Sequence, residues 1–193
     1  MKASLPALLA ALLLATLAPA IAEPVDALLD DFSDAAQSSL GTPRIFLDDT
    51  SAGGRTEVRH SVSDGRLFVS GQITPPRGQP GWASTVLLLD AEGLPRDASR
   101  YSGLRLRLRI KSGNLSVSAN SAAIDNYDYH AAVIERRPGN ELQEVTIPFA
   151  SMQRRWSAQT PLELGELLSI SLVAFGLQPG PFDFEIDEVA FYE

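Results

Sequence analysis

Histidine, cysteine and acidic residues are the side chains that could carry out catalysis here, and their spacing does not favour it. Cysteine is absent, which excludes disulfides, thiolate metal sites and a cysteine nucleophile. His60 and His130 both fall in predicted strands, without the spacing of a zinc or serine-hydrolase motif. Asp183 and Glu185 could form a glycosidase pair, but their spacing along one strand predicts a solvated face. We therefore expect no catalytic residues and a protein that binds its partner without transforming it. A hydrolase with His130 or an acid pair in a deep pocket is the least favoured hypothesis.

Aromatic residues with polar neighbours suggest a carbohydrate site. The segment 125–130 alternates polar and aromatic side chains, and Trp156 lies in a long irregular stretch further along the chain. Sugars bind where aromatic platforms lie beside polar groups. We expect Tyr127 and Trp156 to be exposed, whereas Tyr129 has the alternative of beginning a strand and facing the core. Asp125, Tyr127, Tyr129 and Trp156 are the candidate ligand-binding residues.

A structural calcium ion is the cofactor that the acidic residues suggest. Calcium takes about six to eight oxygen ligands, largely carboxylates and backbone carbonyls. Asp30 and Asp31 lie near the first predicted strand, and Asp187 and Glu188 lie in the last one. Many jelly-roll binding modules hold calcium between these two strands. The alternative is that all four acids line the solvent side of edge strands.

The start of the chain has the features of an export signal. Lys2 gives a positive start, residues 8–17 are almost wholly Leu and Ala, and Ala20 and Ala22 are the small residues that a signal peptidase requires. The apolar run is shorter than the roughly 20 residues of a membrane span. We predict a signal peptide over residues 1–22 and a single domain over residues 23–193, in the periplasm or secreted.

The charge of the predicted mature chain excludes other classes of partner. Removing Lys2 from the 16 Lys and Arg leaves 15, against 24 Asp and Glu, so the formal charge is −9. Such a protein has no basic surface for nucleic acid or anionic lipid. Its length suffices for one domain with its own hydrophobic core.

Short runs of alternating apolar and polar residues, separated by Gly and Pro, predict an all-β sandwich or barrel. In the clearest run, Leu104–Ile110, aliphatic residues face one way and arginines the other. The pair Gly113-Asn114 then predicts a hairpin with Leu115–Ser121.

The last run changes parity at Asp187-Glu188, which predicts a β-bulge there. Leu162–Leu168 is expected to form a short helical turn. The other predicted strands are Leu28–Phe32, Arg44–Leu47, Glu57–Val62, Arg66–Ile73, Ala83–Leu89, His130–Glu135, Leu142–Ile147, Leu168–Gly176 and Phe182–Phe191.

Several local signatures resemble those of the complex I intermediate-associated protein 30 family. Asp49, Gly53, Gly54 and Thr56 are similar to its Asp-x-x-x-Gly-Gly-x-Ser/Thr motif. Further similar blocks follow in the same order and extend the resemblance over roughly residues 30–192: Gly81-Trp82-Ala83-Ser84, Tyr101-Ser102-Gly103-Leu104, Ile147-Pro148-Phe149, and an ending from Phe175-Gly176-Leu177 to Ile186-Asp187.

The resemblance implies a galactose-binding-domain-like jelly-roll β-sandwich and a non-enzymatic role. Mitochondrial members of the family assist assembly of NADH:ubiquinone oxidoreductase. This chain differs from them in its export signal and in Ala52, where the family usually has Met. Trp82 stands where the family has Phe, so we expect it to pack inside the sandwich. The Gly53-Gly54 pair is expected to form a turn with positive φ, bonded by Asp49.

These observations support two binding hypotheses. The first is an exported, chaperone-like binding or assembly module that recognises a protein partner through the loop Thr74–Gly81 and the Gly53-Gly54 turn. The prolines of this loop make it stiff, which lowers the ordering cost of binding. The alternative is a carbohydrate-binding module of the periplasm or cell surface that uses Tyr127, Tyr129 and Trp156.

Overall fold

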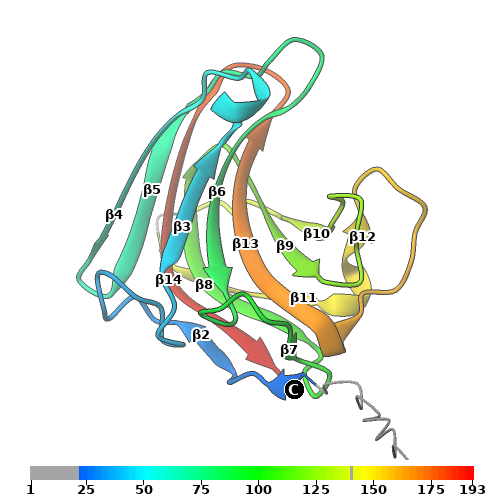
Figure 1. Ribbon diagram of the computed structural model, residues 1–193. Helices are drawn as coiled ribbons and strands as arrows, with labels where there is room; N and C mark the ends of the chain where they lie inside the picture. Colours follow the sequence, from blue (N-terminus) through cyan, green and yellow to red (C-terminus); the bar gives the residue numbers. More distant parts are fainter. Residues whose placement is uncertain (1–21, 140) are drawn as a thin grey trace, which may run out of the picture.

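The described chain folds into two β-sheets packed face to face (Figure 1). The computed structural model describes residues 22–139 and 141–193, so the predicted signal segment, apart from Ala22, lies outside the described residues. Sheet A has eight strands, with β3-β6-β13-β9-β10-β12 in spatial order and β1 and β7 beside one end of β13. Sheet B has six strands, in the order β11-β8-β14-β5-β4, with β2 beside the end of β14. The predicted all-β sandwich is confirmed.

Eleven strands follow the predicted runs closely, whereas three two-residue strands, β1, β7 and β12, were not predicted. Sheet A contains β1 (Glu23–Pro24), β3 (Arg44–Asp48), β6 (Gly81–Leu88), β7 (Arg96–Asp97), β9 (Asn114–Ser121), β10 (His130–Ile134), β12 (Gln153–Arg154) and β13 (Leu167–Gly176). Sheet B contains β2 (Leu28–Asp30), β4 (Glu57–Ser63), β5 (Arg66–Ile73), β8 (Gly103–Ser112), β11 (Gln143–Pro148) and β14 (Gly180–Tyr192). The 3-10 turns are η1 (Asp49–Ala52), η2 (Phe149–Ser151) and η3 (Leu164–Glu166), the last within the predicted helical turn. Within the described residues, no helix has the length and apolarity needed to cross a membrane.

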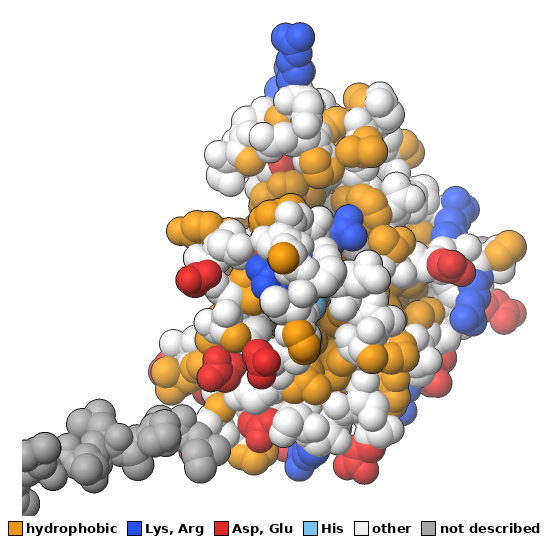
Figure 2. All heavy atoms as spheres, turned by 90° about the vertical axis from the view of Figure 1, so that its right-hand side faces the viewer, with side chains coloured by type: hydrophobic (Ala, Val, Ile, Leu, Met, Phe, Trp, Pro, Cys, Tyr) orange, Lys and Arg blue, Asp and Glu red, His pale blue; other side chains and the backbone are white. Residues whose placement is uncertain are grey.

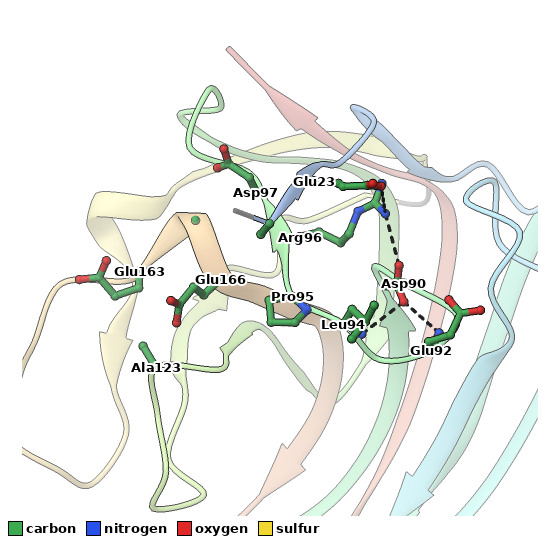
Figure 3. A pocket seen from close by; sticks show the side chains of 12 residues that line it. Glu23, Asp90, Glu92, Leu94, Pro95, Arg96, Asp97, Ala123, Glu163 and Glu166 are labelled. Atoms are coloured by element: carbon green, nitrogen blue, oxygen red, sulfur yellow. Dashed lines mark hydrogen bonds and ion pairs between the residues drawn. The ribbon is translucent and has the colours of Figure 1, made fainter. Parts of the chain in front are cut away.

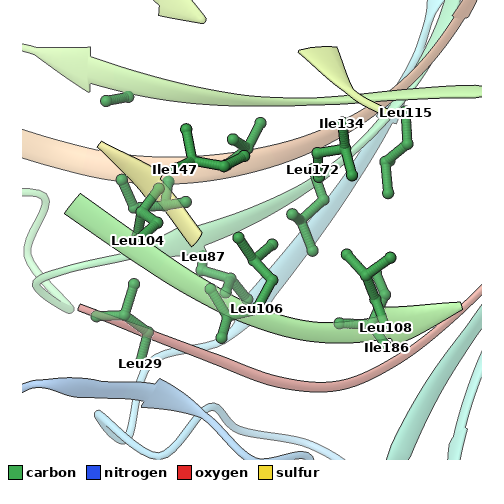
Figure 4. Close-up of a cluster of buried hydrophobic side chains, with 14 of the residues drawn as sticks. Leu29, Leu87, Leu104, Leu106, Leu108, Leu115, Ile134, Ile147, Leu172 and Ile186 are labelled. Atoms are coloured by element: carbon green, nitrogen blue, oxygen red, sulfur yellow. The ribbon is translucent and has the colours of Figure 1, made fainter. Parts of the chain in front are cut away.

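The core lies between the sheets and is built by alternate residues of each strand (Figure 4). Leu104, Leu106 and Leu108 of β8 are fully buried and meet residues of sheet A such as Leu87 and Leu115. Burial of one such side chain stabilises the fold by about 1.5–3 kcal/mol. The arginines between these leucines point away from the core, as the alternation predicts.

The predicted hairpin between β8 and β9 is wrong, because the chain changes sheets at Gly113. Strand β8 pairs with β11 and β14 in sheet B, whereas β9 pairs with β10 and β13 in sheet A. Gly113 has φ +82°, and a Cβ atom there would lie 2.7 Å from the Cβ of Phe182. The glycine therefore permits a tight crossover between the sheets, which the same turn signal in the sequence does not distinguish from a hairpin.

The predicted β-bulge in the last strand is confirmed. The pairing of β14 with β8 shifts register between Ile186 and Glu188. Phe184 and Ile186 before the shift, and Val189 and Phe191 after it, are consequently all buried in one core. Strand β2 pairs with the end of β14, so residues near both ends of the described chain are held in sheet B.

Candidate functional site

Tyr127, Tyr129 and Trp156 lie on two neighbouring segments beside β10 and β12, and we call these side chains the aromatic cluster. The rings of Tyr129 and Trp156 meet edge to face, with centroids 5.4 Å apart and planes at 87°. Tyr127 is 93% exposed and Trp156 is 61% exposed, as predicted. Tyr129 is half-buried just before β10, and burial raises the pKa of its phenol. The structure thus brings predicted ligand-binding residues from separate parts of the sequence together.

The buried carboxylate of Asp128 joins these two segments. It accepts hydrogen bonds from Arg154 Nε (2.9 Å) and from the backbone N–H groups of Arg155 (3.1 Å) and Ser157 (3.0 Å). It also accepts one from the Tyr129 N–H at 2.8 Å. Burial by itself raises the pKa of Asp128, but these hydrogen bonds outweigh it and hold the pKa well below its usual range. The charged carboxylate therefore fixes the backbone beside both Tyr129 and Trp156.

Further hydrogen bonds hold the segment after β12 in place. Arg154 donates to Asn126 Oδ1 (3.0 Å) and Thr160 Oγ1 (3.1 Å), and Asn126 donates to Ser157 Oγ (2.9 Å). The buried His130 ring pairs through Nε2 with the Thr160 carbonyl at 2.7 Å. Sequence reasoning singled out neither Asp128 nor Arg154 as site residues, because no local pattern links residues so far apart in the chain.

The backbone of Tyr127 adopts a conformation that is uncommon for a residue with a side chain. Its φ is +60°, in the left-handed region, which costs on the order of 1 kcal/mol outside glycine. Such strain persists where the surrounding structure fixes it, and it gathers at functional positions. Here it accompanies an almost fully exposed aromatic ring, and the exposed Asp125 lies two residues earlier in the same loop.

The outer face of sheet A extends from the aromatic cluster, and it is lined by small polar side chains. Asn120 donates hydrogen bonds to Ser169 Oγ (2.9 Å) and Ser171 Oγ (3.1 Å) across the β9–β13 pair. Ser118, Ser169 and Ser171 are buried although they point away from the core. We call this surface the serine face. It consists of Trp82, Ser84, Val86 and Leu88 of β6, Ser169, Ser171, Val173 and Phe175 of β13, Asn114, Ser116, Ser118 and Asn120 of β9, and Ala131 and Val133 of β10.

Trp82 belongs to the serine face, so the prediction that it packs inside the sandwich is wrong. Along β6 the inward positions are Ala83, Thr85 and Leu87, which are buried. Alternation then turns Trp82 outward, where it pairs directly with Phe175 of β13. A family resemblance at one position does not determine which side of the sheet that position faces.

The Asp49 motif has a structural role at the end of the sandwich. The buried Asp49 carboxylate accepts hydrogen bonds from Thr56 N (3.1 Å), Thr56 Oγ1 (2.8 Å) and Trp82 N (3.1 Å). Gly53 has the expected positive φ (+84°), whereas Gly54 is needed for space, since a Cβ there would lie 2.1 Å from the Asp49 carboxyl carbon. The motif thus joins η1 to the starts of β4 and β6. The bond from Arg55 N to Thr74 O also sets the turn beside the loop Thr74–Gly81.

All four predicted calcium ligands already have other hydrogen-bond or ion-pair partners. The buried Asp30 accepts hydrogen bonds from Arg44 at 2.5 and 2.8 Å, and Asp31 accepts from Ser33 and Ser39. Asp187 and Glu188 form ion pairs with arginines on the outer face of sheet B. Across residues 22–139 and 141–193, no group of three or more His, Cys, Asp or Glu side chains has an arrangement that could hold a metal ion.

The outer face of sheet B carries rows of paired charges, which we call the charged ladder. Its ion pairs are Arg105–Glu188, Arg107–Asp187, Arg109–Glu185, Lys111–Asp183, Arg66–Glu185 and Arg66–Asp187. Glu185 was predicted to lie on a solvated face, but it is only 1% exposed because Arg66 and Arg109 cover it. Burial raises its pKa, and the two guanidiniums more than compensate, so the pKa of Glu185 is lowered.

A wide acidic depression of about 1030 Å³ lies beside β7 and η3 (Figure 3). Arg96 forms ion pairs there with Glu23 and Asp90, each at 3.3 Å. Glu163 and Glu166 lie apart from these groups, on the other side of the depression. Backbone hydrogen bonds from Leu94 and Glu92 lower the pKa of Asp90, which therefore stays ionised. No local sequence pattern predicts this depression, because its acidic residues come from separate parts of the chain.

Comparison with solved structures supports the architecture. The family 11 carbohydrate-binding module from Clostridium thermocellum, solved with a β-1,3-1,4-mixed-linked tetrasaccharide, has a TM-score of 0.62 and 17% identity, covering 89% of this chain and 97% of that one. A family 30 carbohydrate-binding module has a TM-score of 0.51 and 17% identity, covering 72% and 83% of the two chains. An agarase has a TM-score of 0.57 and 11% identity over 84% of this chain but 24% of its own. At sequence identities this low, the likeness shows the fold alone, which is a galactose-binding-like sandwich.

Comparison with sequences identifies the family. No curated protein sequence matches the chain significantly. The profile of complex I intermediate-associated protein 30 matches residues 34–186, which include the Asp49 motif and the blocks around Trp82, Gly103 and Pro148. The chain therefore belongs to the complex I intermediate-associated protein 30 family.

Proposed function

We propose that this protein is a non-enzymatic carbohydrate-binding module whose ligand contacts the aromatic cluster. The observation that carries the proposal is the exposure of Tyr127 and Trp156 on segments that the buried Asp128 carboxylate holds rigid. Rigid aromatic rings lose little entropy on binding, and sugar rings present C–H faces that pack on them. Hydroxyl and amide groups of the adjacent serine face are suited to bind sugar hydroxyls.

The surroundings of the potential catalytic groups support a binding role. His60 stacks on Phe46 with ring centroids 3.5 Å apart, and His130 is buried against the Thr160 carbonyl. Asp183 and Glu185 are paired with Lys111 and with arginines in the charged ladder. The solved structures with a similar sandwich include a module whose complex contains a mixed-linked tetrasaccharide.

Retention on insoluble and gel-embedded polysaccharides tests the proposal. Purified residues 23–193 should be retained by at least one neutral glucan or galactan, and Trp156→Ala should reduce retention with an unchanged melting temperature. Leu94→Ala is the matched control, because Leu94 is similarly exposed, at 59%, but lies beside the acidic depression. Equal retention of wild type and Trp156→Ala would contradict the proposal.

A protein partner is the second candidate function, and the Asp49 motif favours it. The motif holds the Gly53-Gly54 turn beside the stiff loop Thr74–Gly81, so both form one exposed end of the sandwich. Scrambling residues 75–80 should abolish recovery of a crosslinked partner without changing glycan retention. Residues 1–22 support the further proposal of export to the periplasm or beyond, where both partners would be encountered.

A further inference from the structure

We infer that the serine face is the path of a neutral polysaccharide chain that extends from the aromatic cluster to a second aromatic site at Trp82 and Phe175. This inference rests on the proposed function and names the ligand class of the same site. Figure 2 shows the side of the molecule toward which β10 and β12 lie. Hydrophobic side chains are spread over this side, a few Lys or Arg side chains lie among them in its central part, and most of the acidic side chains lie toward the bottom.

The neutrality of the ligand follows from the residues of the serine face. None of its side chains on β6, β13, β9 and β10 is charged, in a protein of net charge −8. Along the serine face, a polysaccharide with carboxylate or sulfate groups would lose hydration without meeting a cation, and the exposed Arg155 lies outside this face, beside Tyr129. The partly exposed hydroxyls of Ser84 and Ser116 and the amides of Asn114 and Asn120 instead match the hydroxyl groups of a neutral sugar.

The register of sheet A places a row of mostly small side chains across the middle of the serine face. One row across the strands reads Val86, Ser171, Ser118 and Ala131. Ser171, Ser118 and Ala131 are small and almost fully buried, although none of them faces the core. A ligand that extends from Trp82 to the aromatic cluster would cross this row without meeting a protruding side chain from β13, β9 or β10.

Aromatic side chains stand at opposite ends of this path. Trp82 pairs with Phe175 at one end of β6, and Leu88 marks the other end of the same strand. Leu88 is six residue positions after Trp82, which corresponds to about 20 Å along the strand. The aromatic cluster is at the Leu88 end, because Leu88, Ser169 and Asn120 share a row and the pairing of His130 with Ala119 brings Tyr129 to it. Only a ligand of several sugar rings reaches both sites.

Affinity gel electrophoresis and calorimetry test this inference on the mature chain. The gels contain mixed-linked β-1,3-1,4-glucan, agarose or polygalacturonate, and calorimetry uses a disaccharide unit of the neutral polymer that retards the protein, which is too short to reach both sites. Wild type should be retarded by at least one neutral polymer and not by polygalacturonate. Trp82→Ala should weaken binding of that polymer at least about tenfold while leaving disaccharide binding within about twofold. Trp156→Ala should weaken both.

Ser116→Arg provides a second variant if Trp82→Ala proves unstable. It places a long cation in the middle of the serine face and should also weaken polymer binding at least about tenfold, whereas Ser61→Arg on the outer face of sheet B should not. Polymer binding that is unchanged in Ser116→Arg and Trp82→Ala but lost in Trp156→Ala would overturn the inference and leave the proposed function intact. Retardation by polygalacturonate alone would also overturn the inference. A wild-type protein retarded by none of the polymers would reject both.

Discussion

The two outer faces of the sandwich are built by the same alternation of residues but carry opposite kinds of side chain. On sheet B, arginines of β8 and acids of β14 neutralise one another in the charged ladder, and Glu185 is buried beneath two guanidiniums. On sheet A, the serine face has no charges, and an exposed aromatic cluster lies beside it. The charges of the ladder are paired within sheet B, whereas the serine face is uncharged and lies beside exposed aromatic rings. Under the proposed function, the outer face of sheet B contributes stability and that of sheet A contributes recognition.

The largest expected effect comes from breaking the charged ladder. Glu185→Ala leaves Arg66 and Arg109 without their shared carboxylate, so we expect unfolding free energy to fall by about 3 kcal/mol, measured by urea denaturation. Glycan retention should not change. Glu144→Ala, at an exposed position of the same sheet, is the control and should stay within about 0.5 kcal/mol. A loss of glycan binding in Glu185→Ala would contradict the division between the faces.

Asp128→Ala should show that the aromatic cluster depends on a buried charge of its own. The change removes the acceptor of Arg154 and of the Arg155 and Ser157 N–H groups, so we expect a loss of about 2–3 kcal/mol together with weaker glycan retention. Asp125→Ala in the same loop is the exposed control for stability. If Asp128→Ala retained glycans as well as wild type does, the cluster would not need this support.

Stability should fall in acid because both buried carboxylates have lowered pKa values. In the unfolded chain Asp and Glu titrate at about pH 4, and in the folded protein the pKa values of Asp128 and Glu185 lie lower. Their contribution to the free energy of unfolding is therefore complete above about pH 4, and it is lost as the pH falls through the pKa values of the folded state. Denaturation of wild type between pH 7 and pH 2 should show this loss. The Glu185→Ala curve should be flatter in acid, and parallel curves would count against the assignment.

Calcium should have the smallest effect. Since Asp30, Asp187 and Glu188 are already paired with arginines, we expect the melting temperature to be the same in calcium and in chelator. Differential scanning calorimetry at matched ionic strength measures this. A calcium-dependent rise of several degrees would show that these ion pairs open to admit a metal.

The types of the residues predicted much of the candidate site, but they did not predict how these residues come together. Tyr127 and Trp156 are polar-aromatic residues in irregular stretches, and this sufficed to predict their exposure. Asp128 was not singled out, because its role depends on Arg154 and Ser157, which become its neighbours only when β12 pairs with β10. Asp30 was interpreted as a metal ligand for the same reason, since nothing local shows that Arg44 occupies its carboxylate.

The sequence by itself determined the longer strands, the alternation of side chains along them and the bulge at Asp187-Glu188, because alternation is a local property of an extended chain. Only the tertiary structure decided that β8 and β9 belong to different sheets, that Trp82 faces outward and that Glu185 is buried. Each of these depends on which strand lies beside which. Pairing between distant strands follows from packing of the whole core, and no short window of the sequence contains it.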